Sequence, residues 1–227
     1  LVWPVEDVKA ISSDFNVSAL ALIGAGAGIY ALAQTDPGLN RALRDAAPST
    51  DGPLFRAVEE FGNARVVRPA MAMVFLGSLA SGNERFQDAS FTTLESVVLA
   101  NLLTNVLKAA FGRSRPYQDE GPSRFNPFSG NTSFPSGHSA TAFALVTPWM
   151  YYYPSPWTSG LLVLGAGTAL SRVASNVHWV SDVVAGSTIG FLTAYVLTHT
   201  HIERTESITI SPIVTSEGTG VTVAFRP

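Results

Sequence analysis

The sequence predicts an all-α protein that ends in a short β-hairpin, and two patterns carry this prediction. Apolar residues recur with helical spacing in blocks at residues 17–33, 54–81, 90–111, 138–153, 158–174 and 178–200. The pair Gly62-Asn63 divides the second block into two helices. After residue 207 the period changes to alternation, and we expect a hairpin over residues 207–226 with apolar side chains at positions 208, 210, 221, 223 and 225.

The composition fits a single domain over residues 1–227 and excludes several functions. Of the 227 residues 46% are hydrophobic, which is enough for one substantial core. The 14 Lys and Arg residues and 17 Asp and Glu residues give a net charge of -3, so we expect no basic surface for nucleic acid. The chain has no cysteine, which excludes disulfides, thiolate nucleophiles and zinc-thiolate sites.

The composition also raises the question of a membrane. Only 14% of the residues are charged, and the mean hydropathy of +0.23 is high for a water-soluble protein. A membrane-spanning helix needs about 20 mostly apolar residues, a length that residues 15–35 and 183–200 reach or approach. The other predicted helices are shorter or more polar. We therefore expect a soluble or peripheral helical bundle rather than an integral membrane protein.

The first candidate site lies in the stretch "KAAFGRSRP". Lys108 closes an apolar block, and Gly112 together with the residue before Pro116 predicts that the helix ends between Gly112 and Arg115. Lys108 and Arg115 can then bind one anion from a helix end and a loop. The alternative is that both are solvated cations that interact favourably with the helix dipole.

The second candidate site is Pro135-Ser136-Gly137-His138, which follows a loop rich in Pro, Gly, Ser and Asn. If Ser136 caps the next helix, the amides of Gly137 and His138 lie in its first turn and can bind an anion. His138 would then stand beside that anion, able to donate a proton to it. The alternative is an ordinary helix cap with an exposed histidine.

The third candidate site is "SRVASNVHWVSD". His178 and Asp182 are four residues apart, so on a helix that begins near His178 the carboxylate can hold one imidazole nitrogen and leave the other free. Arg172 can join them only if the chain breaks at Ser175-Asn176, and we predict that break. The alternative for His178 is a buried core histidine paired with Asp182.

Together these sites contain the groups that phosphoryl transfer through a phosphohistidine requires: three cations, helix-end amides and two histidines. The cations can perform the electrostatic role of a metal, so we expect neither a metal ion nor a cofactor. His199 and His201, two residues apart near a helix end, are expected to be solvated rather than metal ligands.

In order and spacing, these residues resemble the motifs of the type 2 phosphatidic acid phosphatase (PAP2) superfamily, which also contains the vanadium haloperoxidases. The motif positions extend over residues 108–182. The resemblance implies a PAP2-like helical bundle in which His178 is the nucleophile, Asp182 orients it, and His138 protonates the leaving group. It implies that the phosphate is bound by Lys108, Arg115, Ser136, Gly137 and Arg172, with Ser171 as an outer member of this group.

The expected function is that of a metal-independent phosphatase acting on phosphate monoesters or diphosphates. Aromatic residues Tyr117, Phe125, Phe128 and Trp179 near the site favour a lipid substrate of the phosphatidate, phosphatidylglycerophosphate or polyprenyl diphosphate type. The resemblance implies a periplasmic or other extracytoplasmic location in the cell envelope, with peripheral membrane contact. The alternatives are a non-specific soluble acid phosphatase acting on small phosphate esters, a haloperoxidase that binds vanadate in place of phosphate, and a non-enzymatic membrane structural or transport bundle.

Overall fold

The computed structural model describes residues 19–47, 50, 52–215 and 218–225, and the side chains of residues 28–47, 50 and 52–203. The first residues of the predicted block 17–33 and of the apolar stretch 15–35 lie outside this range. The elements of the described part are α2 (Ala19–Ala46), α3 (Pro53–Phe61), α4 (Ala64–Leu79), α5 (Glu84–Phe111), the 3-10 helix η1 (Pro116–Gln118), α6 (Gly137–Tyr152), α7 (Pro156–Ala174), α8 (Val180–Ser207), β1 (Ile208–Thr215) and β2 (Gly218–Phe225).

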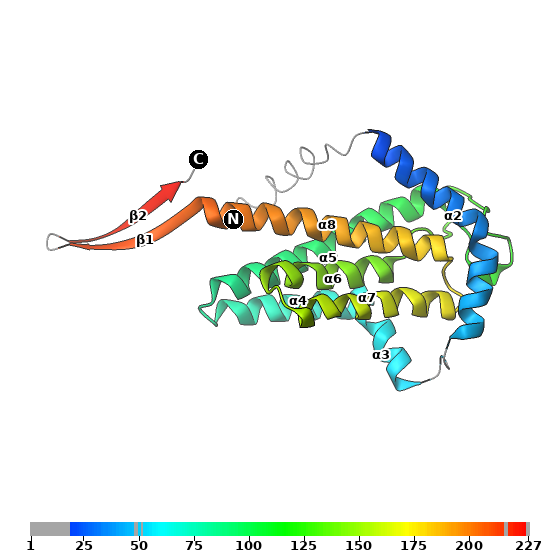
Figure 1. Cartoon of the computed structure of the whole chain (residues 1–227), viewed down its shortest axis with the longest axis horizontal. Coiled ribbons are helices and arrows are strands. Elements are labelled where there is room, and N and C mark those ends of the chain that lie inside the picture. The colour runs from blue at the N-terminus through cyan, green and yellow to red at the C-terminus, as the bar shows by residue number, and fades with distance from the viewer. Residues whose placement is uncertain (1–18, 48–49, 51, 216–217, 226–227) are drawn as a thin grey trace.

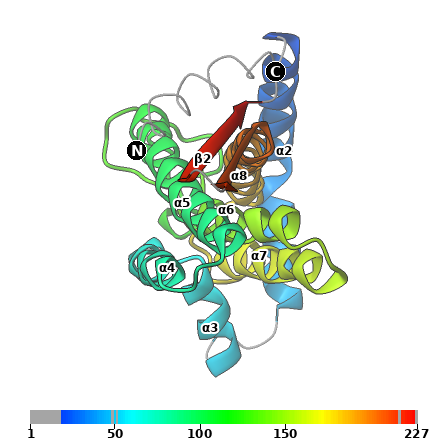
Figure 2. The same cartoon turned by 90° about the vertical axis from the view of Figure 1, so that its left-hand side faces the viewer.

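The all-α prediction is confirmed, and the helices form a bundle around α6. Helix α6 packs against α5, α7 and α8, while α4 packs on α5 and α3 on α7. The bundle helices run nearly parallel to the long axis, and α2 crosses one end of them (Figure 1). At that end α5 and α7 finish and α6 and α8 begin, which brings the three sequence motifs together. Viewed along the bundle, α3 lies at its edge, next to α4 and α7 (Figure 2).

Helix α2 is longer than the sequence predicted, because it continues beyond residue 33 to Ala46 and includes Pro37. A proline inside a helix removes one backbone hydrogen bond, so periodicity alone gave no reason to extend the helix. The continuation carries Asp36 and Asn40, both buried, which bind the backbone at the start of α8. Tertiary contacts therefore stabilise the second half of α2.

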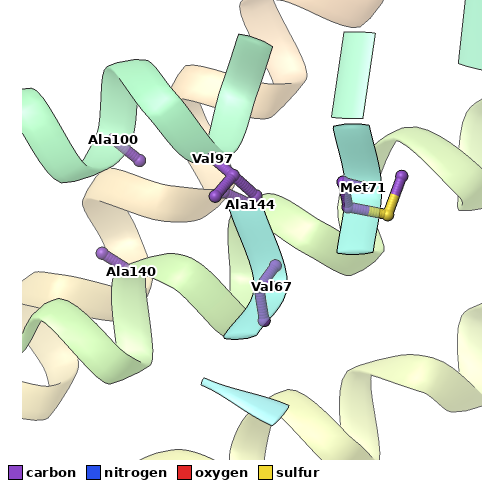
Figure 3. Close-up of a cluster of buried hydrophobic side chains, with 6 residues drawn as sticks. All are labelled: Val67, Met71, Val97, Ala100, Ala140 and Ala144. Carbon is purple, nitrogen blue, oxygen red and sulfur yellow. The ribbon is translucent and has the colours of Figure 1, made fainter. Parts of the chain in front are cut away.

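The bundle interior consists largely of small side chains, which let the helices approach closely. One buried cluster joins α4, α5 and α6 through Val67, Met71, Val97, Ala100, Ala140 and Ala144 (Figure 3). Helices α6 and α8 approach so closely that a Cβ atom added to Gly186 would overlap the carbonyl of Ser136, and one added to Gly190 that of Ala140. Small residues at helix contacts are typical of membrane bundles.

Large apolar side chains lie instead on the outside of several helices. They include Val98, Leu102, Leu103 and Val106 of α5, Val163, Leu164 and Leu170 of α7, and Val184, Leu192 and Tyr195 of α8. Within the described residues, α5 and the part of α8 up to Glu203 are long and apolar enough to cross a membrane, and only 28% and 44% of their most apolar segments are buried. A core helix of a soluble protein would be mostly buried, so this surface fits contact with lipid.

The chain ends in two antiparallel strands. The register pairs Ile208 with Phe225 and Thr215 with Gly218. These bounds fall within the range 207–226 given by the alternating sequence pattern, of which residues 216, 217 and 226 lie outside the described part. In Figure 1 the strands continue from the end of α8 that is remote from α2.

We predict opposite effects for two glycine-to-alanine changes in the bundle. Gly186→Ala should lower the melting temperature by several degrees, since overpacking costs about 1–3 kcal/mol. Gly160→Ala, at an exposed helical position with no atom within 4 Å of an added Cβ, should raise it slightly, because alanine has about 1 kcal/mol better helix propensity than glycine. Thermal unfolding of the two purified variants checks this, and equal shifts would contradict the close α6–α8 contact.

Candidate active site

Lys108 and Arg115 converge on one residue of the long loop. Helix α5 ends at Phe111 with Gly112 in the left-handed conformation at φ 55°, as the sequence predicted. Lys108 donates from Nζ to the carbonyl of Thr132 at 2.5 Å, and Arg115 donates from Nη2 to the Thr132 hydroxyl at 3.2 Å. Both cations are half-buried, so they are not simply solvated charges at a helix end.

Ser136 caps α6, as predicted. The helix begins at Gly137, and the Ser136 hydroxyl accepts the amide of Ser139 at 3.4 Å. The first-turn amides of a helix have no acceptor within it, so those of Gly137 and His138 are available to an anion. An added Cβ on Gly137 would lie 3.7 Å from Cε of Lys108, which places this cation beside the helix end.

Arg172 lies in the last turn of α7, and the predicted break follows it. Helix α7 ends at Ala174, and the carbonyl of Arg172 accepts the amides of Val177 and His178 at 3.2 Å each. Nη1 of Arg172 donates to Glu59 of α3 at 2.6 Å. Its Nε is buried and has no hydrogen-bond partner in the described part of the chain. One edge of this guanidinium is thus fixed while another donor stays unused.

His178 and Asp182 meet, but not on one helical face. Helix α8 begins only at Val180, so the expectation that His178 opens the helix is wrong. The Asp182 carboxylate accepts a hydrogen bond from the backbone amide of Trp179, the last residue before α8, at 3.0 Å. Oδ2 of Asp182 also lies 3.4 Å from Nδ1 of His178. His178 is only 2% exposed. The contact with Nδ1 leaves Nε2 for other chemistry.

The sequence analysis missed Arg113, which holds Asp182 from behind. Its guanidinium is 1% exposed and donates to Asp182 at 2.6 Å and to Asp36 of α2 at 2.8 Å. Nε of Arg113 donates to the carbonyl of Pro122 at 2.8 Å, so the side chain also fixes the long loop. Arg113 lies in the sequence between Lys108 and Arg115, but its partner Asp36 lies 77 residues earlier.

Asn40 and Ser133 were also missed, and both act on the same loop. The Asn40 amide donates to the carbonyl of His178 at 3.0 Å and accepts the amide of Val180 at 2.9 Å. The Ser133 hydroxyl donates to Asp182 Oδ2 at 2.5 Å. Helix α2 and the long loop therefore clamp the histidine segment from two sides.

Two expected members of the site lie elsewhere. The Ser171 hydroxyl donates to the carbonyl of Thr168 in its own helix at 2.8 Å, so it is not directed at the cations. Trp179 is only 6% exposed and donates to the carbonyl of Ser114, so it packs the loop rather than forming a rim. Tyr117 and Phe128 are 56% and 83% exposed and are available at the surface.

The site holds both histidines in the neutral form. Burial lowers the pKa of His178 to about 3, although Asp182 acts in the opposite direction. Burial also lowers the pKa of His138 to about 4, and the nearby positive charges of Arg172, Lys108 and Arg115 add to this shift. The three cations therefore act on His138 together, although they come from different helices and a loop.

The chain belongs to the PAP2 superfamily, whose family model matches residues 89–206. It is 39% identical over 105 residues to a lipid A 1-phosphatase of Rhizobium etli, a match covering 44% of this chain and 44% of that protein. It is 28% identical over 141 residues to an undecaprenyl-diphosphatase of Sulfolobus acidocaldarius, covering 59% of this chain and 62% of that protein. The chain thus spans less than two thirds of the length of either relative.

A solved structure shows the same fold. The transmembrane PAP2 type phosphatidylglycerolphosphate phosphatase of Bacillus subtilis superposes with a TM-score of 0.62 at 20% identity, covering 80% of this chain and 96% of that one. The apolar outer faces of α5 and α8 agree with membrane association. The expectation that a soluble or peripheral state is preferred over an integral one finds no support.

We predict that Arg113→Met lowers the free energy of unfolding by about 3–5 kcal/mol, because it leaves Asp36 and Asp182 as buried carboxylates without their cation. The matched control is Arg124→Met. Arg124 lies 4.0 Å from Glu120 with both side chains largely exposed, so its loss should cost under about 1 kcal/mol. Denaturant unfolding followed by tryptophan fluorescence measures both, and a similar loss in the two variants would contradict a structural role for Arg113.

Proposed function

We propose that this protein is a metal-independent phosphatase that releases phosphate from a lipid through a phosphohistidine on His178. The observation that supports it most strongly is the arrangement around His178, in which three cations from α5, α7 and the loop face the capped start of α6. Such an array neutralises the equatorial oxygens of a phosphoryl group in transfer. The names of the relatives, lipid A 1-phosphatase and undecaprenyl-diphosphatase, support the same class of reaction.

In the proposed mechanism Nε2 of His178 attacks phosphorus in line with the leaving oxygen. Asp182 holds Nδ1, which fixes the tautomer and stabilises the imidazolium that forms. Lys108, Arg115, Arg172 and the amides of the first turn of α6 bind the phosphoryl oxygens. His138 gives its proton to the leaving alkoxide, and then takes one from the water that hydrolyses the phosphohistidine.

His138 must carry a proton to act as the acid, although its pKa in the empty site is about 4. A bound phosphate offsets the charges of Arg172, Lys108 and Arg115 that contribute to this low value. The pKa of His138 should therefore rise when substrate binds, and the site acquires its acid together with its substrate.

The proposed substrate is a phosphate monoester or diphosphate of a lipid, and the proposed location is the membrane. The apolar outer faces of α5, α7 and α8 would hold the protein where such lipids reside. The extracytoplasmic side of the envelope, implied by the family resemblance, is part of this proposal. The absence of a cofactor is also part of it, and vanadate is expected to bind as a phosphate mimic.

The direct test is phosphate release in EDTA from a lipid phosphate, a polyprenyl diphosphate and a small soluble ester. We expect turnover of the lipids, and a loss of at least about 10³-fold in His178→Asn, since the nucleophile is removed. His199→Ala, which changes a histidine that contacts Tyr195 on α8, is the matched control and should keep full activity.

Three results would contradict parts of this proposal. Turnover by His178→Asn would exclude the phosphohistidine. Dependence on an added metal would exclude the metal-independent mechanism. Equal rates on the small ester would indicate a non-specific phosphatase, and bromide oxidation with vanadate and peroxide in place of phosphate release would indicate a haloperoxidase.

A second prediction concerns the protonation of His138 when an anion binds. At pH 6 binding of vanadate should be accompanied by uptake of up to about one proton, because His138 is neutral in the empty site and its pKa rises when an anion offsets the cations. Calorimetric titrations in two buffers of different ionisation enthalpy measure this number. The His138→Asn variant corrects for protons taken up by vanadate itself, and the same uptake in both proteins would refute the assignment.

A further inference from the structure

An apolar cavity lies between the end of α2, helix α3 and the second half of α7. Its volume is about 460 Å³, within the range of roughly 300–1,000 Å³ found for ligand pockets. Leu43 comes from α2, Phe55 and Val58 from α3, and Gly167 and Ala174 from α7. The cavity opens to the outside, since Leu54 and Leu170 in its wall are 77% and 52% exposed.

The wall of the cavity offers nothing to a polar ligand. Of the residues that the structure places in it, only Ser171 has a polar side chain. The hydroxyl of Ser171 already donates to the carbonyl of Thr168. A ligand in this cavity would therefore be bound through its hydrocarbon surface alone.

Two helices, α7 and α3, contribute neighbouring residues to the cavity and to the phosphate site. On α7, Ser171 lines the cavity and the next residue, Arg172, belongs to the phosphate site. On α3, Val58 lines the cavity and the next residue, Glu59, accepts from Arg172 at 2.6 Å and from Ser175 at 2.8 Å.

Helix α3 is also fixed against the catalytic end of the bundle. The Thr168 hydroxyl donates to the carbonyl of Val58 at 2.8 Å. At the end of α3, Gly62 lies so close to the carbonyl of His138 that an added Cβ would reach 2.6 Å from it. Consecutive residues have Cα atoms about 3.8 Å apart, so the cavity wall and the phosphate site adjoin on both α3 and α7.

We propose that this cavity binds a hydrocarbon chain of the substrate while its phosphate lies on Arg172. The inference rests on the proposed function and specifies the substrate class as a phosphate ester with an apolar chain. Each methylene group that enters the cavity should tighten binding roughly fourfold. The Arg172–Glu59 pair marks the boundary between the polar and apolar parts of the ligand.

The test compares butyl phosphate with dodecyl phosphate, which carry the same head group, in Ala174→Phe. In the wild type KM should be far lower for dodecyl phosphate. The added ring fills the cavity, so KM for dodecyl phosphate should rise at least about tenfold while kcat and KM for butyl phosphate stay unchanged. Ala166→Phe, at an exposed position on the same helix that is not part of the cavity wall, is the matched control and should behave as wild type.

A second variant changes the cavity in the opposite direction and protects the test against misfolding of the first. Phe55→Ala enlarges the cavity and should move the chain length with the lowest KM to longer esters. Unchanged chain-length dependence in both variants would overturn the inference, as would an equal rise in KM for butyl and dodecyl phosphate. The first result would mean that the hydrocarbon chain of the substrate binds elsewhere. The second would mean that changes in the cavity wall affect only the binding of the phosphate group.

Binding separates this inference from the proposed function. Butylphosphonate and dodecylphosphonate cannot be hydrolysed, and calorimetry measures their affinities for the wild type and the three variants whether or not phosphate is released. If no ester is turned over but Ala174→Phe weakens dodecylphosphonate alone, the phosphatase proposal fails and the chain-binding cavity stands. If phosphate is released but Ala174→Phe weakens the binding of both phosphonates equally, the phosphatase proposal stands and the chain-binding cavity fails.

Discussion

The geometry of the site depends on one buried cation. Arg113 lies between Asp182, the partner of His178, and Asp36 in the middle of α2, and the three side chains are almost completely buried. A buried charge is stable only when it is paired and hydrogen-bonded, so these groups fix one another. The guanidinium therefore links three separate parts of the chain, and its position sets where the carboxylate, and hence the imidazole, can lie.

The other three cations of the candidate site are held by hydrogen bonds to neighbouring segments. Lys108, Arg115 and Arg172 are anchored at their edges by Thr132, by the carbonyl of Val177 and by Glu59. Each cation is thus pre-positioned, which lowers the reorganisation needed when an anion binds. The same concentration of positive charge, added to burial, keeps His138 neutral in the empty site. In the proposed mechanism, affinity for phosphate and the protonation of His138 therefore have a common electrostatic origin.

The packing of the bundle explains how a site of this kind operates beside a membrane. Small residues and glycines lie inside, where α6 and α8 approach closely, and large apolar residues lie outside. This distribution differs from that of a typical water-soluble bundle, and it gives no support to the soluble or peripheral state expected from helix length and polarity. Polar groups concentrate at the α2 end, where the helix termini and the long loop satisfy their hydrogen bonds. A second buried polar group lies at the other end of the bundle, where Nδ1 of His201 lies 2.7 Å from the Thr92 hydroxyl, so the expectation that His201 is solvated is wrong.

The sequence by itself determined the helices, because their signals are local: apolar periodicity, the Ser136 cap, Gly112 at the end of α5 and the break after Arg172. Motif spacing also predicted the cations and histidines of the candidate site. Only the tertiary structure decided what holds them, since Asp36, Asn40 and Glu59 lie far along the chain from the residues they bind. It also decided that α2 continues past Pro37, that the Ser171 hydroxyl donates to Thr168, and that Trp179 donates to Ser114. Contacts between distant residues set these features, and no local pattern encodes them.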